Sequence, residues 1–369
     1  MQILSAQETG VSRTISGDQL FETDVIVEGL HVVGDIEQIN SDVLMVAERG
    51  GRVLHVTIGE NPPTEAAVQE HHTIENIYAV GQGGLLDIAL GSDYSNTGIL
   101  FVVYTTETRK GVVTRLSRFT DTTEGWTNEV ILYDADPVGA NKHYGSAVTL
   151  LPDRTLLFSL GERGNLDLAQ NLGTLHGKTI RLTRDGRVPR DNPFIKNENA
   201  LNEIYTYGHR NPQGLAVHPE TGRVYAIEHG PSGYDRAGGG DEINLLSPGE
   251  NFGWPIIHHK LERRNMVTPM VEYTPATAPS AGIFYTSRVA PWWTNDLFVA
   301  NLRGQSLLRL KITEDRVIDQ EFLLEGTFGR IRAVGSDDRG SLYIGTSNGD
   351  LRGQNNRDVV VRLTPIASE

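Results

Sequence analysis

The feature that most constrains the fold is a pattern that occurs six times along the chain: an apolar strand, a short polar or glycine-containing turn, and a second strand. The copies begin at Val43, Ile99, Leu156, Val224, Leu297 and Leu342. Each copy joins an alternating, β-branched strand to a partner across a turn, which is typical of a β-hairpin. Copies about 45–75 residues apart suit the four strands of a propeller blade. We therefore predict an all-β fold, a six-bladed β-propeller with four-stranded antiparallel blades.

The chain, residues 1–369, is predicted to form a single propeller domain, since propellers of this length fold as one unit. Its first residues, roughly 20 of them, form either a tail or a closing segment. We expect a strand at Asp24–Val27 to complete the last blade, because a closed ring leaves no exposed sheet edge. Helical patterns are weak, and only Thr64–Glu75 and Asn165–Leu175 are expected to form short helices inside loops.

Composition excludes several classes of function. The net charge of −14 argues against nucleic acid or an anionic membrane as a partner. The chain has no cysteine, which excludes disulfides, thiolate catalysis and thiolate zinc sites. No apolar run reaches the roughly 18 residues of a membrane span, and MQILSAQETGVSRTISG is not a secretory signal. These features favour a protein without membrane insertion whose few basic residues can be considered one by one.

The stretch from Glu203 to Pro255 combines two predicted strands, Ile204–Tyr207 and Arg223–Glu228, with unusual loops. In HRNPQG, Pro212 disfavours helix at the residue before it and holds Asn211 extended. In EHGP, Gly230 and Pro231 offer backbone carbonyls from a stiff turn, and carbonyl oxygens are ligands that Ca²⁺ accepts. The glycine run 238–240 allows a tight fold before Asp241. Turns between the strands of a β protein are the plainer explanation for any one of these motifs.

A few other residues have side chains suited to chemistry. His143 precedes a strand in NKHYGSAVTLLPD, and histidine is well suited to take a proton near neutral pH, although such a histidine is often structural. Arg330 and Arg332 are two apart in an apparent strand, which predicts that both lie on one face, and a solvated face is the alternative. Arg303 lies in the turn of the preceding repeat. With Arg210, these arginines would gather four positive charges in an acidic protein.

HRNPQG, EHGP, GGGDEIN and NFGWP occur in this order, and the run resembles the PQQ-dependent sugar dehydrogenases, which comprise soluble quinoprotein glucose dehydrogenase and the aldose sugar dehydrogenases. The resemblance extends from about Val43 to Leu363 and is strongest from His143 to Pro255. It implies PQQ and Ca²⁺ as cofactors, an aldose sugar as substrate and an external electron acceptor as partner. The implied reaction oxidises the C1 hydroxyl of the sugar to the lactone.

The resemblance also implies roles for individual residues. The implied general base is His143. The implied PQQ contacts are Gln82 in GQGG, Arg210, Asn211, Arg303, Arg330 and Arg332. The implied ligands of the Ca²⁺ at the cofactor are the carbonyls of Gly230 and Pro231, and those of a second Ca²⁺ are Glu242 and the carbonyl of Phe252. The arginines suit the three carboxylates of PQQ because guanidinium groups pair with carboxylates through two hydrogen bonds.

Two positions depart from the family pattern. Lys142 stands where the glucose dehydrogenase branch has an aspartate before the histidine, which favours the aldose branch. Arg303 stands where the family commonly has a lysine, which keeps the charge but changes its geometry. The sequence between Ile256 and Pro291 keeps the proline-rich character of the family but not its motifs. Sugar-contacting residues are expected partly in such loops, and none is assigned individually.

Two other classes of function remain open. A calcium-dependent sugar lactonase, also a six-bladed propeller, would need carboxylate metal ligands in place of arginines around a pair of carbonyls. A non-catalytic propeller would bind a partner protein without a cofactor. The resemblance implies a periplasmic or secreted protein, and the sequence is compatible with a monomer or a homodimer.

Overall fold

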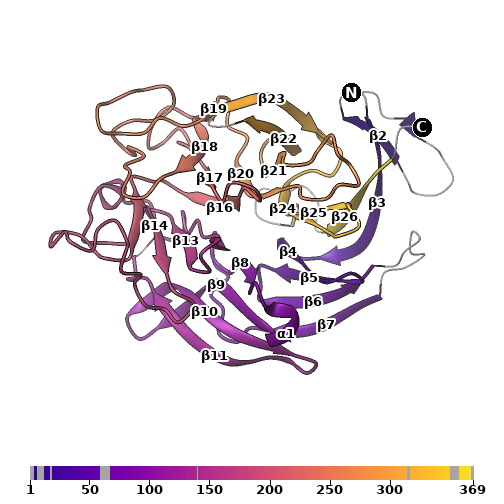
Figure 1. Ribbon diagram of the computed structural model, residues 1–369, viewed down its shortest axis with the longest axis horizontal. Helices are drawn as coiled ribbons and strands as arrows, with labels where there is room; N and C mark the ends of the chain where they lie inside the picture. Colours follow the sequence, from indigo (N-terminus) through magenta and orange to yellow (C-terminus); the bar gives the residue numbers. More distant parts are fainter. Residues whose placement is uncertain are drawn as a thin grey trace. The chain divides into compact units, whose positions relative to one another are not determined.

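The computed structural model describes residues 4–5, 12–16, 19–58, 67–138, 140–313, 316–349 and 357–366, and almost all of their regular structure is β-strand (Figure 1). The helices in these ranges are α1 (Tyr94–Thr97) and one 3-10 turn, η1 (Leu166–Ala169). The strands form six sheets, and neighbouring strands pair antiparallel. Packing divides the chain into two compact units, residues 74–281 and residues 1–73 with 282–369.

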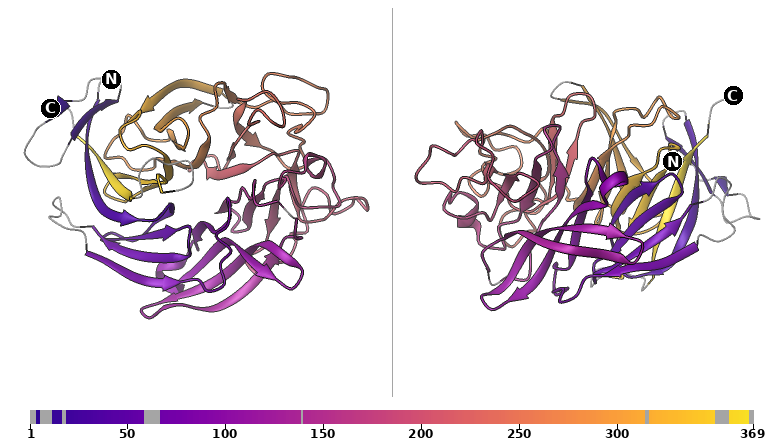
Figure 2. Two further views of the ribbon diagram at one scale, coloured as in Figure 1. Left: turned by 180° about the vertical axis from the view of Figure 1, so that it is seen from behind. Right: turned by 60° about the horizontal axis from the view of Figure 1, so that its bottom comes forward.

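Three sheets belong to residues 74–281. In spatial order their strands are β11 (Gly125–Asp134), β10 (Gly111–Thr122), β9 (Ile99–Thr108) and β8 (Leu85–Leu90); β12 (Val148–Leu150), β13 (Leu156–Leu160), β14 (Lys178–Leu182) and β15 (Ile204–Tyr207); and β16 (Pro212–Val217), β17 (Val224–Glu228), β18 (Asp241–Leu246) and β19 (Val271–Tyr273). The views in Figure 2 show the strands of each sheet side by side. Each sheet is built from strands consecutive in sequence.

The other sheets belong to residues 1–73 and 282–369, except that β20 begins just before residue 282. Their strands are β4 (Val33–Asn40), β5 (Val43–Glu48), β6 (Arg52–Thr57) and β7 (Ala67–Thr73); β20 (Pro279–Phe284), β21 (Leu297–Asn301), β22 (Ser306–Thr313) and β23 (Arg316–Leu323); and β1 (Leu4–Ser5), β2 (Ser12–Ser16), β3 (Gln19–Leu30), β26 (Asp358–Pro365), β25 (Leu342–Thr346) and β24 (Ile331–Ser336). Six sheets of this connectivity confirm the predicted six-bladed β-propeller.

All six predicted hairpins are present, and each falls within one sheet. The predicted strand Ile204–Tyr207 matches β15 in both bounds, and the strand predicted at Arg223–Glu228 begins one residue later as β17. The predicted closing strand is also confirmed. Asp24 pairs with Arg362 and Val27 with Val360, so the N-terminal β3 joins the C-terminal β26 in one sheet. The grouping of residues 1–369 into a single domain stays a prediction.

The expectation of a helix at Thr64–Glu75 is wrong over residues 67–73, which form strand β7. Residues 64–66 lie outside the described residues. The stretch contains good helix formers, but β6 offers an unpaired edge and the ladder between them satisfies the backbone, so tertiary pairing overrides local propensity. The second expected helix, Asn165–Leu175, is reduced to the 3-10 turn η1.

The hydrophobic core of residues 74–281 lies between neighbouring sheets. Phe101 and Val103 of β9 share one buried cluster with Phe158 of β13 and Ile180 of β14. Because both faces of a middle strand are covered, β13 and β17 are buried along their whole length. The loops that leave these two buried strands therefore start from well-packed positions.

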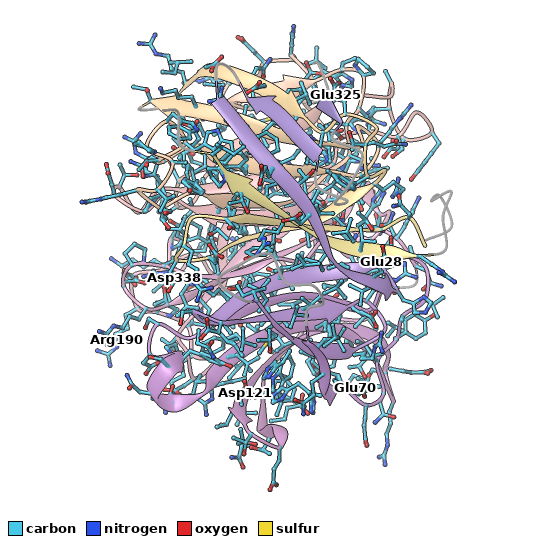
Figure 3. All side chains as sticks on the ribbon, turned by 90° about the vertical axis from the view of Figure 1, so that its right-hand side faces the viewer. Glu28, Glu70, Asp121, Arg190, Glu325 and Asp338 are labelled. Atoms are coloured by element: carbon cyan, nitrogen blue, oxygen red, sulfur yellow. The ribbon has the colours of Figure 1, made fainter. Side chains whose placement is uncertain are left out.

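Charged side chains such as Glu28, Arg190 and Glu325 are exposed (Figure 3).

Candidate active site

His143 is held in the loop before β12 by contacts at both its backbone and its ring. Its backbone N–H donates to Gln82 Oε1 at 2.6 Å, and its Nδ1 lies 2.9 and 2.8 Å from the two carboxylate oxygens of Glu162. The residue is 3% exposed and has a φ of 51°, a left-handed conformation that is uncommon outside glycine. A buried, strained histidine fixed at three points is typical of a functional site rather than of a surface loop.

Burial lowers the pKa of His143 below its ordinary value, and the charges of Arg210 and Lys142 act in the same direction, whereas the hydrogen bond to Glu162 opposes them. The ring is therefore neutral at pH 7, and Nδ1–H donates to the Glu162 carboxylate. That tautomer leaves a lone pair on Nε2. Arg210 Nη2 lies 3.2 Å from Nε2, and the hydroxyl of Tyr234 lies 3.5 Å from it. His143 is thus arranged to accept a proton at Nε2.

The sheet connectivity explains why Glu162 reaches His143. Strands β12 and β13 pair with Val148 opposite Phe158, so the loop before β12 and the loop after β13 lie at the same end of the sheet. Gly161 permits the close approach, because a Cβ there would lie 2.1 Å from the carbonyl oxygen of His143. Glu162 is itself 1% exposed, and its backbone N–H donates to the carbonyl of Arg210 at 2.9 Å.

Arg210 is buried at 2% exposure and is held by an ion pair with Asp235, at 2.7 Å from Nη2. Its Nη1 donates to the carbonyl of His229 at 3.1 Å, and its Nη2 donates to the Ser232 hydroxyl at 3.1 Å. Although burial works against ionisation, the charge of Arg210 and nearby backbone N–H groups hold the pKa of Asp235 below its ordinary value. Asp235 therefore stays ionised and keeps the guanidinium beside His143.

Asn211 supplies the clearest sign that this region accepts a ligand. It is 1% exposed, yet neither its amide nitrogen nor its amide oxygen has a hydrogen-bond partner among the described residues. Leaving both ends of a buried amide unsatisfied costs free energy, so native structures rarely do it without a functional reason. Gly145 borders the same amide, since a Cβ there would lie 2.3 Å from Asn211 Oδ1. A polar molecule bound here would satisfy Asn211.

The turn at Gly230 and Pro231 is fixed by Asp241. Gly230 N–H donates to Asp241 Oδ1 at 2.8 Å, and the other carboxylate oxygen accepts from the N–H groups of Thr277 and Ala278, each at 2.7 Å. The carbonyl of Pro231 accepts a hydrogen bond from Gly239 at 3.2 Å. This rigid turn is compatible with carbonyl ligation of Ca²⁺, although the Pro231 carbonyl would then share its oxygen with Gly239.

Glu242 lies in a row of carboxylates that crosses three strands. It is directly opposite Glu228 on one side and Glu272 on the other. Burial raises the pKa of Glu242 well above its ordinary value, and the charges of Glu228, Asp241 and Glu272 raise it further. Its carboxylate accepts a hydrogen bond from Asn244 Nδ2 at 3.0 Å. Like charges placed across a sheet repel one another, so a cation would stabilise this arrangement.

Phe252, the other residue predicted at this second ion, stacks its ring on His209 with centroids 4.8 Å apart. His209 in turn contacts Glu228 through Nδ1 at 2.9 Å, so Phe252 reaches the carboxylate row through two contacts. The role of the Phe252 carbonyl as a ligand stays a prediction.

We expect Glu242→Gln to bind one Ca²⁺ per chain fewer than the wild-type protein, because a neutral amide cannot replace the charge of a carboxylate ligand. Calcium titration measures the number of ions bound. Saturating that site in the wild-type protein, at about one hundred times its Kd, should add about 2.7 kcal/mol to the free energy of unfolding. The matched control is Glu124→Gln, an exposed carboxylate in the β10–β11 turn. Equal calcium stoichiometry in wild type and Glu242→Gln would contradict the assignment.

The three remaining arginines belong to the unit formed by residues 1–73 and 282–369. Arg303 is exposed in the turn between β21 and β22. Only Arg332 lies within strand β24, which begins at Ile331, so the prediction that both Arg330 and Arg332 belong to the strand is correct for Arg332 alone. The register shifts between Ile331 and Ala333, which makes Arg332 the extra residue of a β-bulge. Simple alternation therefore does not set the direction of the two side chains.

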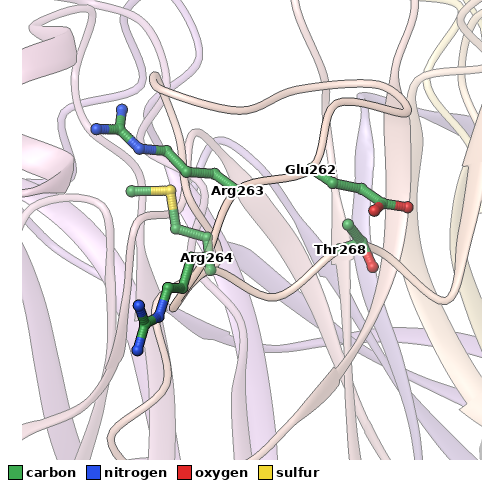
Figure 4. Close-up of a pocket in the computed structure, with 5 residues that line it drawn as sticks. Glu262, Arg263, Arg264 and Thr268 are labelled. Carbon is green, nitrogen blue, oxygen red and sulfur yellow. The ribbon is translucent and has the colours of Figure 1, made fainter.

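A surface hollow of about 450 Å³ lies on the loop between β18 and β19 and is lined by Glu262, Arg263, Arg264, Met266 and Thr268. Figure 4 shows the two guanidinium groups on one side of this loop and Glu262 on the other. It contains none of the predicted site residues.

Sequence analysis missed Glu162, Asp235 and Tyr234. Glu162 occurs in GERGN, directly after a predicted strand, and a carboxylate at that position was the available signal for a partner of His143. Asp235 and Tyr234 lie in PSGYDRAGGG, where nothing local distinguishes them from ordinary loop residues.

Comparison with known proteins adds independent findings. Residues 34–353 match the family described as Glucose / Sorbosone dehydrogenase. The chain is similar to the aldose sugar dehydrogenase YliI of Escherichia coli, with 30% identity covering 84% of this chain and 85% of that protein. It is also similar to quinoprotein glucose dehydrogenase B of Acinetobacter calcoaceticus, with 28% identity covering 64% of this chain and 53% of that protein.

Among solved structures, the PQQ-bound form of an aldose sugar dehydrogenase from Streptomyces coelicolor superposes with a TM-score of 0.79 and 26% identity, covering 93% of this chain and 98% of that one. Among the described residues, no helix is long and apolar enough to cross a membrane.

Proposed function

Because the chain belongs to the glucose/sorbosone dehydrogenase family, we propose that it oxidises the C1 hydroxyl of aldose sugars to the lactone, with PQQ and Ca²⁺ as cofactors. The observation that carries the proposal is the buried His143–Glu162 pair, whose Nε2 lies 3.2 Å from Arg210 Nη2. Asn211, the next residue along the chain, has a buried amide without a hydrogen-bond partner among the described residues. The electrons then pass to an external acceptor. A periplasmic or secreted location, which the resemblance of the sequence implies, stays a prediction.

In this scheme the residues of the chain position and deprotonate the sugar. His143 Nε2 takes the proton of the C1 hydroxyl, and Glu162 holds the ring in the required tautomer and stabilises the imidazolium that forms. Arg210, held by Asp235, offers N–H groups where negative charge develops. When bound, PQQ would supply the acceptor for the hydride of C1; with the proton taken by His143, the sugar would lose two electrons and two hydrogens and become the lactone.

The cofactor contacts follow from the chemistry of the donor groups. Asn211 would satisfy both ends of its amide on PQQ. Gln82 would contribute its amide N–H₂, because its oxygen already accepts the hydrogen bond from His143. Gly230 and Pro231 would provide carbonyl oxygens for Ca²⁺, which acts as a Lewis acid toward the cofactor. Arg303, Arg330 and Arg332 would pair with the cofactor carboxylates.

We expect Arg332→Ala, and Arg330→Ala likewise, to weaken PQQ binding by roughly 2–5 kcal/mol, because truncating one partner of a desolvated charge pair leaves the other unpaired. Turnover should recover as PQQ is raised, and calorimetric titration should show the lower affinity directly. Arg316→Ala, at an exposed arginine of β23, is the control. Unchanged PQQ affinity in both variants would mean that these arginines form only a solvated face.

The proposal is tested by reconstituting the purified protein with PQQ and Ca²⁺ and measuring dye reduction with a panel of aldoses. We expect reduction that requires sugar, PQQ and a divalent cation together. Hydrolysis of sugar lactones without dye reduction would favour the lactonase instead, and the absence of both activities would favour a binding module.

A further inference from the structure

Lys142, which precedes the base, has contacts along the outer part of its side chain. Its carbon stem lies over Gly164, where a Cβ would come within 2.3 Å of the Lys142 Cε. Its ammonium lies 4.6 Å from the ring centroid of Tyr234. The residue is half-buried. Long lysine side chains are usually mobile, and fixing this one costs conformational entropy that a solvent-exposed charge would not require.

The charge of Lys142 is not matched by a carboxylate among the residues that the structure describes. The two nearby carboxylates are committed elsewhere, Glu162 to His143 and Asp235 to Arg210. Arg163, in the loop after β13, donates from Nε to the carbonyl of Lys142 and from Nη2 to the carbonyl of Val138, and its guanidinium stacks on Tyr144 at 3.5 Å. Lys142 is therefore left with a fixed positive charge close enough to His143 to help lower its pKa.

Tyr234 places an aromatic face beside the same spot. Its hydroxyl lies 3.5 Å from His143 Nε2, yet the residue is 65% exposed. An exposed aromatic ring with a polar hydroxyl suits a ligand with an apolar face and polar groups around its edge, as a sugar ring has. A sugar whose C1 hydroxyl reaches Nε2 would therefore lie against Tyr234, with the Lys142 ammonium within reach of another substituent.

We infer that the preferred substrate is an aldose that carries a carboxylate, a hexuronic acid, with C1 at His143 and the carboxylate at Lys142. The inference rests on the proposed function and narrows its substrate class. A single ammonium matches the single charge of a carboxylate, whereas a phosphate brings up to two charges and three acceptor oxygens that call for more donors. In the reaction the C1 hydroxyl loses its proton to His143 and C1 loses its hydride to the cofactor, while the carboxylate is unchanged.

The test compares kcat/KM for glucuronate and glucose in the PQQ-loaded protein. We expect glucuronate to be favoured by about 10- to 100-fold, the value of a hydrogen-bonded charge pair. In Lys142→Gln the ratio should fall to near one, Lys142→Arg should retain most of it, and 1 M salt should weaken it. Lys110→Gln, an exposed lysine in the β9–β10 turn, should keep the wild-type ratio. A wild-type ratio of one or below, or a preference for glucose 6-phosphate over glucuronate, overturns the inference.

A binding measurement separates this inference from the proposed function. The 1,5-lactone of glucaric acid and glucono-1,5-lactone differ only in having a carboxylate or a hydroxymethyl group at C5, and neither can be oxidised again at C1. Calorimetry should show tighter binding of the glucaric lactone to the wild-type protein and equal binding of both to Lys142→Gln. Selective binding without turnover of any aldose would retain the anionic-sugar site and reject the dehydrogenase. If the protein oxidises aldoses but binds both lactones equally, the anionic-sugar site is rejected and the dehydrogenase is retained. The same holds if the only effect of Lys142→Gln is a loss of PQQ affinity.

Discussion

His143→Ala is expected to lower turnover with every aldose by about 10²- to 10⁴-fold, the usual effect of losing a general base. PQQ and Ca²⁺ should remain bound, because the ring of His143 contacts Glu162, Arg210 and Tyr234 and holds no cofactor group in the proposed scheme. The measurement is the rate of dye reduction at saturating PQQ and Ca²⁺, together with a calorimetric PQQ affinity.

The matched control is His31→Ala, an exposed histidine in the other unit. The structure also narrows the alternatives for the base. His209 is fully buried, and its two ring nitrogens are bonded to the side chains of Thr206 and Glu228 inside the core, whereas the Nε2 of His143 faces the 65% exposed Tyr234. Turnover by His143→Ala near the wild-type rate would place the base elsewhere and contradict the site described here.

Glu162→Gln is expected to lower turnover by a similar factor, about 10²- to 10⁴-fold, although residue 162 touches no reacting atom. Glutamine can offer its amide N–H₂ to Nδ1, which favours the tautomer protonated at Nε2 and removes the lone pair that accepts the sugar proton. Glu162→Asp keeps the charge and should recover part of the rate. A glutamine variant that folds, binds PQQ and turns over normally would show that the Glu162–His143 pair is only structural.

The pH profile distinguishes a positioning role from a general loss of stability. Only neutral imidazole accepts a proton, so the wild-type rate should fall as the pH drops through the pKa of His143, which burial holds below its ordinary value. Glu162 raises this pKa, and its removal should lower it further. The acid limb of the rate profile should therefore move to lower pH in Glu162→Gln. A limb that stays in place would show that Glu162 does not act on His143.

The blades could be predicted because their signals are local. Alternation of apolar and polar residues and a turn between two strands are visible within 15 to 20 residues, roughly the length of one hairpin. Ile204–Tyr207 was therefore located in both bounds. The closing strand also followed from a general rule, because β3 pairs with β26 to avoid an open sheet edge.

The parts that were not predicted depend on contacts between segments far apart in sequence. Strand β7 forms at Ala67–Thr73 because β6 provides a partner, which outweighs the helical preference of its residues. Arg332 occupies a bulge that the alternation pattern does not reveal. Glu162 and Asp235 act as partners of His143 and Arg210 only because the fold packs their loops together. For Glu162 the only local signal was a carboxylate directly after a predicted strand, and for Asp235 there was none.

The most direct test of the proposed mechanism is a single turnover of the PQQ-loaded protein mixed anaerobically with glucuronate or glucose, each with hydrogen or deuterium at C1. Cofactor reduction is followed by absorbance and the sugar product by mass spectrometry. We expect one equivalent of lactone per reduced cofactor, slower reduction with the deuterated sugars, and no reduction in His143→Ala on the same timescale. Hydride loss from C1 assisted by His143 would be contradicted if reduction were equally fast with deuterium at C1 and in His143→Ala. It would also be contradicted if no aldose reduced the bound PQQ.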